Sequence, residues 1–192
     1  MLALTLITTA FAEVPPASAS WTLLQETPVR IECTTWQSKP YCRSTGVIGT
    51  PVANASSVFA QLDKYVSKMG AISLVQRLEP DVLHVVMDYP FPLSDRDYVA
   101  RFTHHTEADG TEVYAWSPVT HAAAPETSGI VRLTWLDGQW RFSAEGSSTR
   151  VTYIWEANPG GGLPDVNAVY KQAGTLAIQD MANACSTQVL SP

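Results

Sequence analysis

The sequence predicts an α+β fold in which a curved antiparallel β-sheet wraps around one long C-terminal α-helix. Two observations favour it. Short segments with alternating apolar side chains, separated by turn residues, fill most of the chain between residues 29 and 156. A long segment follows, Asp165 to Gln188, whose apolar residues recur every three or four positions. A single antiparallel sheet has to bury one face, and this helix is its natural cover.

Composition limits the kinds of partner. The chain has 192 residues, of which 45% are hydrophobic, so it suits one domain with a substantial core. The formal net charge is −6 and the pI is about 5.1. An acidic chain gains no binding energy from neutralising the phosphates of a nucleic acid, so nucleic acid is not expected as a partner. No basic patch indicates a dedicated site for anionic membranes, so only transient membrane contact is expected.

The N-terminus reads as an export signal. Residues 1–12 are mostly apolar and end in Ala10-Phe11-Ala12, a small-x-small cleavage pattern, although the basic region that usually precedes such a run is missing. A frayed apolar N-terminus is the alternative. Residues 13–20, with Pro15 and Pro16, read as a tether, and residues 21–190 as the domain. We therefore expect a periplasmic or secreted protein.

The first hairpin carries a candidate disulfide. Val29 to Thr35 and Tyr41 to Ile48 alternate around the turn residues 37–40, which places Cys33 opposite Cys42. Opposed positions on an antiparallel pair bring Cβ atoms within about 4.5–5.5 Å, close to what a disulfide needs. The alternative is two buried free thiols. Cys185 falls on the apolar face of the last helix, which predicts an inert buried thiol.

The remaining elements follow in order. Asn54 or Ser56 would cap a helix that runs to Gly70. The predicted strands are Ile72 to Glu79, Val82 to Asp88, Tyr98 to Thr106, Glu112 to Pro118, Gly129 to Asp137, Gln139 to Ala144 and Arg150 to Glu156. Asp137-Gly138 between two apolar runs is the strongest short hairpin signal in the chain.

The C-terminal helix is preceded by a run that interrupts the strand pattern. Residues 158–164 read Asn-Pro-Gly-Gly-Gly-Leu-Pro, and Asp165 then caps the helix. Gly174 lies near its middle and should weaken it by about 1 kcal/mol relative to Ala. The glycines at 160–162 could hinge this helix as a lid and Gly174 could let it flex; the alternative is a fixed packing helix.

Four spaced motifs together resemble the START domain, the lipid-transfer fold named after the steroidogenic acute regulatory protein. Trp21 stands where members of the family often have a tryptophan at the start of their first segment. Residues 92–99, Pro-Leu-Ser-Asp-Arg-Asp-Tyr-Val, resemble the family's Pro-x-Ser-x-Arg-Asp-aromatic-Val stretch. Residues 129–132, Gly-Ile-Val-Arg, and residues 158–164 are similar to two further family segments. The resemblance covers roughly residues 21–189, and the family's N-terminal helix is abbreviated here.

The resemblance implies a helix-grip fold that encloses one lipid or sterol-like molecule under the C-terminal helix. On that helix Val169, Tyr170, Ala173 and Leu176 would face the ligand. It also implies that Arg101 points into the cavity; a solvent-facing arginine is the alternative. The cavity carboxylate of the family has no clear counterpart, and His84, Met87 and Asp88 lie on the corresponding strand. Arg96 and Asp97 are expected to fix the start of their strand rather than to touch the ligand.

Aromatic residues on the later strands are candidates for the cavity wall. Most belong to the ordinary core, and a subset lining a cavity would suit an apolar ligand. We take Trp116, Trp135, Tyr153 and Trp155 as candidates, together with His84.

Catalytic and metal sites are not predicted. The four histidines form no metal-ligand spacing, and the sequence contains no Gly-x-Ser-x-Gly elbow and no Walker-type loop. We therefore expect no cofactor, no metal and no catalytic residue, in a monomer that carries a hydrophobic ligand. One alternative is a helix-grip enzyme such as a polyketide cyclase or aromatase, which would need a His–carboxylate pair in its cavity. Another is an interaction module whose cavity has collapsed, below the ~300–1,000 Å³ of ligand sites.

Overall fold

The computed structural model describes residues 13–89, 94–158 and 166–186. The predicted signal segment 1–12, the bend at 90–93 and the glycine run with Asp165 lie outside these described residues. The elements are β1 (Thr22–Gln25), β2 (Arg30–Trp36), β3 (Lys39–Ile48), α1 (Val52–Ala60), β4 (Ile72–Glu79), β5 (Val82–Met87), β6 (Arg96–Thr106), β7 (Glu112–Pro118), β8 (Val131–Arg132), β9 (Gly138–Glu145), β10 (Ser148–Glu156) and α2 (Val166–Ser186).

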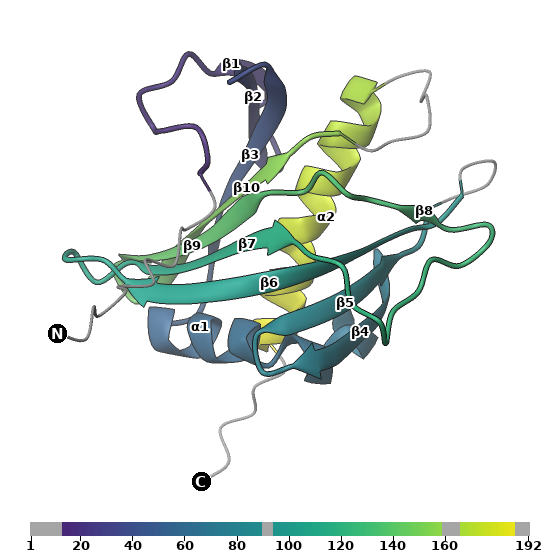
Figure 1. Ribbon diagram of the computed structural model, residues 1–192. Helices are drawn as coiled ribbons and strands as arrows, with labels where there is room; N and C mark the ends of the chain where they lie inside the picture. The colour runs from purple at the N-terminus through teal and green to yellow at the C-terminus, as the bar shows by residue number, and fades with distance from the viewer. Residues whose placement is uncertain (1–12, 90–93, 159–165, 187–192) are drawn as a thin grey trace, which may run out of the picture.

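The strands form one antiparallel sheet that curves around α2, as the sequence predicted. The strand order is β1-β2-β3-β10-β9-β7-β6-β5-β4, and β8 pairs in parallel with β6 off this path. Figure 1 shows α2 running behind the sheet, with α1 below it, so that both helices cover the same face. We call this the inner face and the opposite one the outer face.

The first hairpin and its disulfide are confirmed. β2 pairs with β3 in the register that sets Cys33 opposite Cys42, and their sulfur atoms are bonded with the Cα atoms 4.0 Å apart. The turn is tight because Gln37 and Ser38 both adopt positive φ. Cys185 is a buried free thiol, and burial raises its pKa to about 11.

The predicted first helix is shorter than expected. α1 ends at Ala60, and two 3₁₀ turns (Leu62–Lys64 and Val66–Lys68) continue the path toward Gly70. Pro51 occupies the N-cap position, so neither Asn54 nor Ser56 is the cap. Pro51 suits this place because proline has no N–H to leave unsatisfied.

The predicted strand Gly129 to Asp137 is wrong in extent. Only Val131–Arg132 pair, and the partner is β6 rather than β9. Asp137-Gly138 therefore makes no hairpin, because β9 already begins at Gly138 and pairs with β7 and β10. Gly138 serves a different purpose: a Cβ there would lie 2.1 Å from the indole of Trp116 on the neighbouring strand.

Two glycines let α2 approach the sheet closely. A Cβ on Gly174 of α2 would lie 2.3 Å from Ser44 Oγ and 2.9 Å from the ring of Trp155. On the sheet side, a Cβ on Gly46 of β3 would lie 2.7 Å from Ile178 of α2. The middle of α2 is thus packed directly onto β3 and β10.

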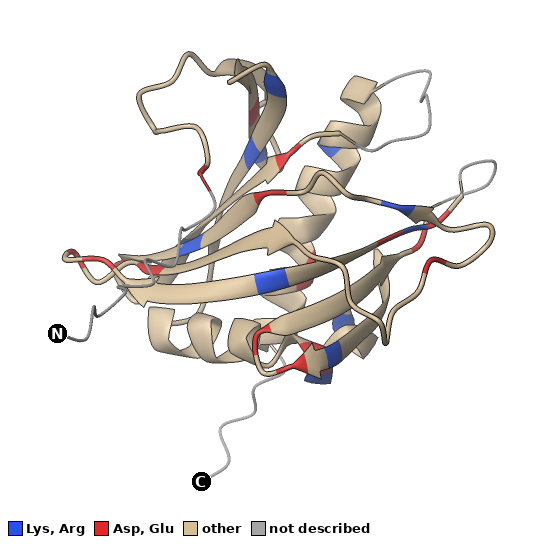
Figure 2. Cartoon of the chain, viewed as in Figure 1, with Lys and Arg blue, Asp and Glu red and all other residues tan. Residues whose placement is uncertain are grey.

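Charge is distributed unevenly. α1 carries no charged residue and α2 only Lys171 and Asp180, whereas the strands and their loops hold most of the acidic and basic side chains (Figure 2). Among the described residues, no helix is both long and apolar enough to cross a bilayer.

Candidate functional site

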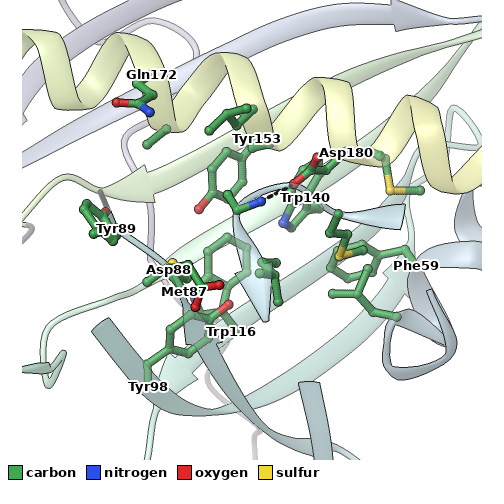
Figure 3. Close-up of a pocket in the computed structure, with 18 of the residues that line it drawn as sticks. Phe59, Met87, Asp88, Tyr89, Tyr98, Trp116, Trp140, Tyr153, Gln172 and Asp180 are labelled. Carbon is green, nitrogen blue, oxygen red and sulfur yellow. Dashed lines mark hydrogen bonds between the residues drawn. The ribbon is translucent and has the colours of Figure 1, made fainter. Parts of the chain in front are cut away.

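An apolar cavity lies between the inner face of the sheet and α2. Its volume is about 140 Å³. Strand and loop residues form its floor and α2 forms its roof (Figure 3). The lining side chains are Phe59, Leu62, Met69, Ala71, Ile72, Met87, Asp88, Tyr89, Tyr98, Phe102, Trp116, Trp140, Tyr153, Val169, Gln172, Ala173, Leu176, Ala177, Asp180 and Met181.

The two ends of the cavity differ in exposure. Phe59, which is buried, lies at one end, and the buried Asp180 lies on the same side of the cavity (Figure 3). Asp88 and Gln172, which are exposed, lie with Tyr89 at the other, as Figure 3 shows. The end with Asp88, Tyr89 and Gln172 is therefore the more exposed one.

Aromatic rings form much of the floor. Trp140 stacks on Tyr153 with ring centroids 4.4 Å apart, and Trp116 stacks on Tyr153 at 5.7 Å. Phe59 of α1 packs against Trp140 at 5.4 Å. Rings of this kind offer large, rigid contact area to an apolar molecule.

Asp180 connects α2 to the segment that precedes β4. Its carboxylate accepts hydrogen bonds from the backbone N–H groups of Gly70, at 2.9 Å, and Ala71, at 3.3 Å. Asp180 is buried and lines the cavity. The carboxylate therefore satisfies two backbone donors just before β4 and fixes the distance between α2 and that segment.

Half of the ligand contacts predicted from the sequence line the cavity. Trp116 and Tyr153 do so from the sheet, and Val169, Ala173 and Leu176 from α2. The other five lie elsewhere. Trp155 is buried in the core against Gly174, and the hydroxyl of Tyr170 donates to the carbonyl of Ala157 at 2.5 Å.

Trp135, another of the five, is 60% exposed, and Lys39 places its ammonium 5.7 Å from the ring centroid. It lies in the connection before β9 that was predicted to be a strand. Without that strand the predicted alternation no longer applies, so nothing directs Trp135 toward the cavity.

Arg101 lies on the outer face, which corrects its predicted place in the cavity. Its guanidinium bonds the carboxylates of Asp81, at 2.6 Å, and Glu79, at 2.9 Å, and the side chain is 44% exposed. On β6 the inner positions belong to Tyr98 and Phe102, which line the cavity. Because side chains alternate along a strand, Arg101 has to point the other way.

His84 also belongs to the outer face. Its Nε2 lies 2.8 Å from Asp97 Oδ2, and Asp97 in turn accepts two hydrogen bonds from Arg132, at 2.8 and 2.7 Å. Burial by itself would raise the pKa of Asp97, but the hydrogen bonds from Arg132 and His84 outweigh it and hold this pKa below its usual value. The group joins β5, β6 and β8.

Arg96 and Asp97 do not pair with each other. Arg96 is 2% exposed, donates to the carbonyl of Ser94, and places its guanidinium 4.5 Å from the ring centroid of Tyr89. Both residues therefore hold the start of β6 in place.

Several lining residues were missed by sequence reasoning. Tyr98 and Phe102 could have been found from the alternation of β6, had its inner face been known. Met87 and Asp88 were noted only as possible counterparts of a family carboxylate, and both line the cavity. Within the described part of the chain, no cluster of three His, Cys, Asp or Glu side chains could hold a metal.

Comparison with known proteins identifies the family. A sequence model of the START domain matches residues 14–190. The chain belongs to the START domain family. Its match with rat phosphatidylcholine transfer protein (Rattus norvegicus) is 30% identical over 129 residues, which covers 64% of this chain and 59% of that protein. An uncharacterized protein of Pseudomonas aeruginosa is 37% identical over 79 residues, 41% of this chain and 39% of that protein. These matches span less than two thirds of either relative.

Solved START structures share the fold. The STAR-related lipid transfer protein of Xanthomonas axonopodis superposes with a TM-score of 0.69 at 18% identity, over 86% of this chain and 97% of that one. Human StAR-related lipid transfer protein 5 gives a TM-score of 0.69 at 16% identity, over 88% of each chain. The helix-grip architecture predicted from the sequence is therefore confirmed.

Proposed function

We propose that this START domain binds a single hydrophobic molecule, a lipid or sterol-like compound, in the cavity beneath α2. The observation that carries the proposal is the cavity itself, which is lined mainly by aromatic and aliphatic side chains and has exposed polar ones at one end. Burial of apolar ligand area would drive binding, at about 25 cal/mol per Å² before the costs of association.

The comparisons support lipid binding. The chain belongs to the START family, and the curated relative from rat is named for the transfer of phosphatidylcholine. We extend the relative's lipid-binding role to this chain as a proposal, because the match covers 59% of that protein.

The size of the cavity favours a second candidate. At about 140 Å³ it is smaller than the ~300–1,000 Å³ typical of ligand pockets. A lipid would therefore need α2 to move away from the segment before β4, where the N–H groups of Gly70 and Ala71 bond Asp180. In this proposal α2 is the lid. If the helix stays closed, the domain would act instead as an interaction module with a collapsed cavity.

The enzyme alternative requires a His–carboxylate pair in the cavity. The buried His84–Asp97 pair lies on the outer face of the sheet, and the lining side chains of the described residues include no histidine. The cavity observed here thus offers the cyclase alternative no such acid–base pair.

We further propose export to the periplasm or the exterior, with residues 1–12 as signal peptide, and a monomeric carrier that touches membranes transiently. The disulfide between Cys33 and Cys42 supports an oxidising compartment. Fractionation of cells that express the full chain checks this. N-terminal sequencing of the exported form should find the start after Ala12.

Native mass spectrometry tests the binding proposal. The purified domain is examined for a co-purified molecule, which is then extracted and identified, and the emptied protein is offered labelled sterol, phospholipid and fatty acid. A lipid bound in a one-to-one ratio supports the carrier. An empty protein that takes up none of the three contradicts it and leaves the collapsed module.

A further inference from the structure

We propose that the cavity selects amphipathic molecules whose polar group carries no net negative charge, and that it discriminates against free carboxylates such as fatty acid anions. The inference rests on the proposed ligand-binding function and adds the chemical class of the ligand. It follows from which hydrogen-bonding groups and which charges the cavity presents.

Tyrosine hydroxyls are the first observation. Tyr89, Tyr98 and Tyr153 line the cavity, and none of their hydroxyls has a hydrogen-bond partner among the described residues. Burial raises the pKa of all three phenols, and the proximity of Tyr98 and Tyr89 raises that of Tyr153 further, so all are neutral at physiological pH. A neutral phenol can donate and accept, which suits a ligand hydroxyl, carbonyl or other uncharged group.

The charges of the lining are the second observation. Asp88 and Asp180 are the charged residues among the lining side chains, and neither Lys, Arg nor His lines the cavity within the described residues. The segments outside the described residues contain no Lys, Arg or His in their sequence. An anion inside the cavity would therefore lack a cationic partner, and burying an unpaired carboxylate costs several kcal/mol.

Asp88 adds repulsion at the more exposed end. Its side chain is exposed beside Tyr89, whereas the Asp180 carboxylate is already occupied by the N–H groups of Gly70 and Ala71. A carboxylate entering from that end would approach a like charge. A neutral or positively charged group would not suffer this repulsion, and a positively charged one would gain from it.

Arg96 is a buried cation near this end. Its guanidinium lies against the ring of Tyr89, donates to the carbonyl of Ser94 and is 2% exposed. Arg96 is not among the lining side chains, so the cavity surface formed by the described residues presents no positive charge.

Three probes with one tail and different heads test the selectivity. Decanol, decyltrimethylammonium and decanoate are titrated separately into the purified full-length domain at about pH 7.5, where the carboxylate of decanoate is ionised. Binding is followed by calorimetry and by the intrinsic tryptophan fluorescence of the protein, because Trp116 and Trp140 line the cavity. We expect decanoate to bind at least tenfold more weakly than either of the other two.

Two variants sharpen the test. Asp88→Asn should strengthen the binding of decanoate relative to that of decanol about two- to fivefold, as expected for removing an exposed like charge. Asp81→Asn is the matched control, because Asp81 is an exposed carboxylate paired with Arg101 on the outer face, and it should change neither. Decanoate binding as tightly as decanol overturns the charge selectivity. Failure of all three probes to bind contradicts the proposed function itself.

Discussion

At Gly174 the absence of a side chain sets how closely α2 approaches the sheet. From the sequence this glycine was expected to weaken the helix, and both a flexing lid and a fixed packing helix were open. In the structure it is buried, and a Cβ there would meet Ser44, Trp155 and Ile31 at 2.3 to 3.0 Å. The residue therefore packs the helix in place, which the spacing of apolar residues along one helix could not reveal.

Replacing Gly174 by alanine should destabilise the domain. The helix would gain about 1 kcal/mol in propensity, but overpacking against Ser44 and Trp155 costs about 1–3 kcal/mol, so we expect a net loss. Urea unfolding measures it. Gly49→Ala is the matched control, since nothing lies within 4 Å of a Cβ at that position. A Gly174→Ala protein more stable than wild type would show that the close contact does not govern the packing.

The Asp97 group gives a second prediction at the scale of single residues. Asp97→Asn should lower the free energy of unfolding at about pH 7 by about 3 kcal/mol, because it breaks a buried ion pair with Arg132. The pKa of Asp97 is depressed in the folded state, so its contribution is complete above the unfolded pKa of about 4. It is then lost as the pH falls through the lower folded value.

Unfolding curves at neutral and acidic pH check this sign. The gap between wild type and Asp97→Asn should shrink steadily below about pH 4. The exposed pair of Asp81 with Arg101 serves as comparison, and Asp81→Asn should cost less than about 1 kcal/mol. An equal loss in both variants would mean that burial of the Asp97 group contributes nothing.

At the scale of elements, the sequence located most strands but could not orient them. Alternation along β6 places Asp97, Val99 and Arg101 on one face. It could not say that this face is the outer one, because that choice depends on the partners β5, β7 and β8. The Asp137-Gly138 signal failed for a related reason: Gly138 makes room for the Trp116 indole of another strand, a contact that no local pattern encodes.

The junction of α2 with the segment before β4 governs access to the cavity in our proposal. Asp180→Ala would remove the acceptor for the backbone N–H groups of Gly70 and Ala71, at roughly 1 kcal/mol for each hydrogen bond. We expect bound lipid to leave about tenfold faster, as measured by its transfer to acceptor vesicles. Gln179→Ala, at the exposed neighbouring position of α2, is the control. Identical release rates in the three proteins would rule out opening at this junction.

At the scale of the whole molecule, the curved sheet and one helix leave a cavity that is small as it stands. The family and the fold followed from motifs and periodicity in the sequence. The volume of the cavity did not, because it depends on how far α2 lies from the sheet, and Gly174, Gly46 and Asp180 set that distance together. Ligand uptake therefore requires α2 to move away from the sheet.

The central claim is that the space between α2 and the sheet holds the ligand, and a cavity-filling substitution tests it most directly. In Ala173→Phe a large ring replaces a methyl group that lines the cavity, and Gln179→Phe puts the same ring on the exposed side of α2. Both variants and wild type are loaded with lipid, and the number of lipid molecules bound per protein is measured by native mass spectrometry. We expect the one-to-one complex in wild type and Gln179→Phe and its loss in a folded Ala173→Phe. A full lipid complement in Ala173→Phe would contradict the account.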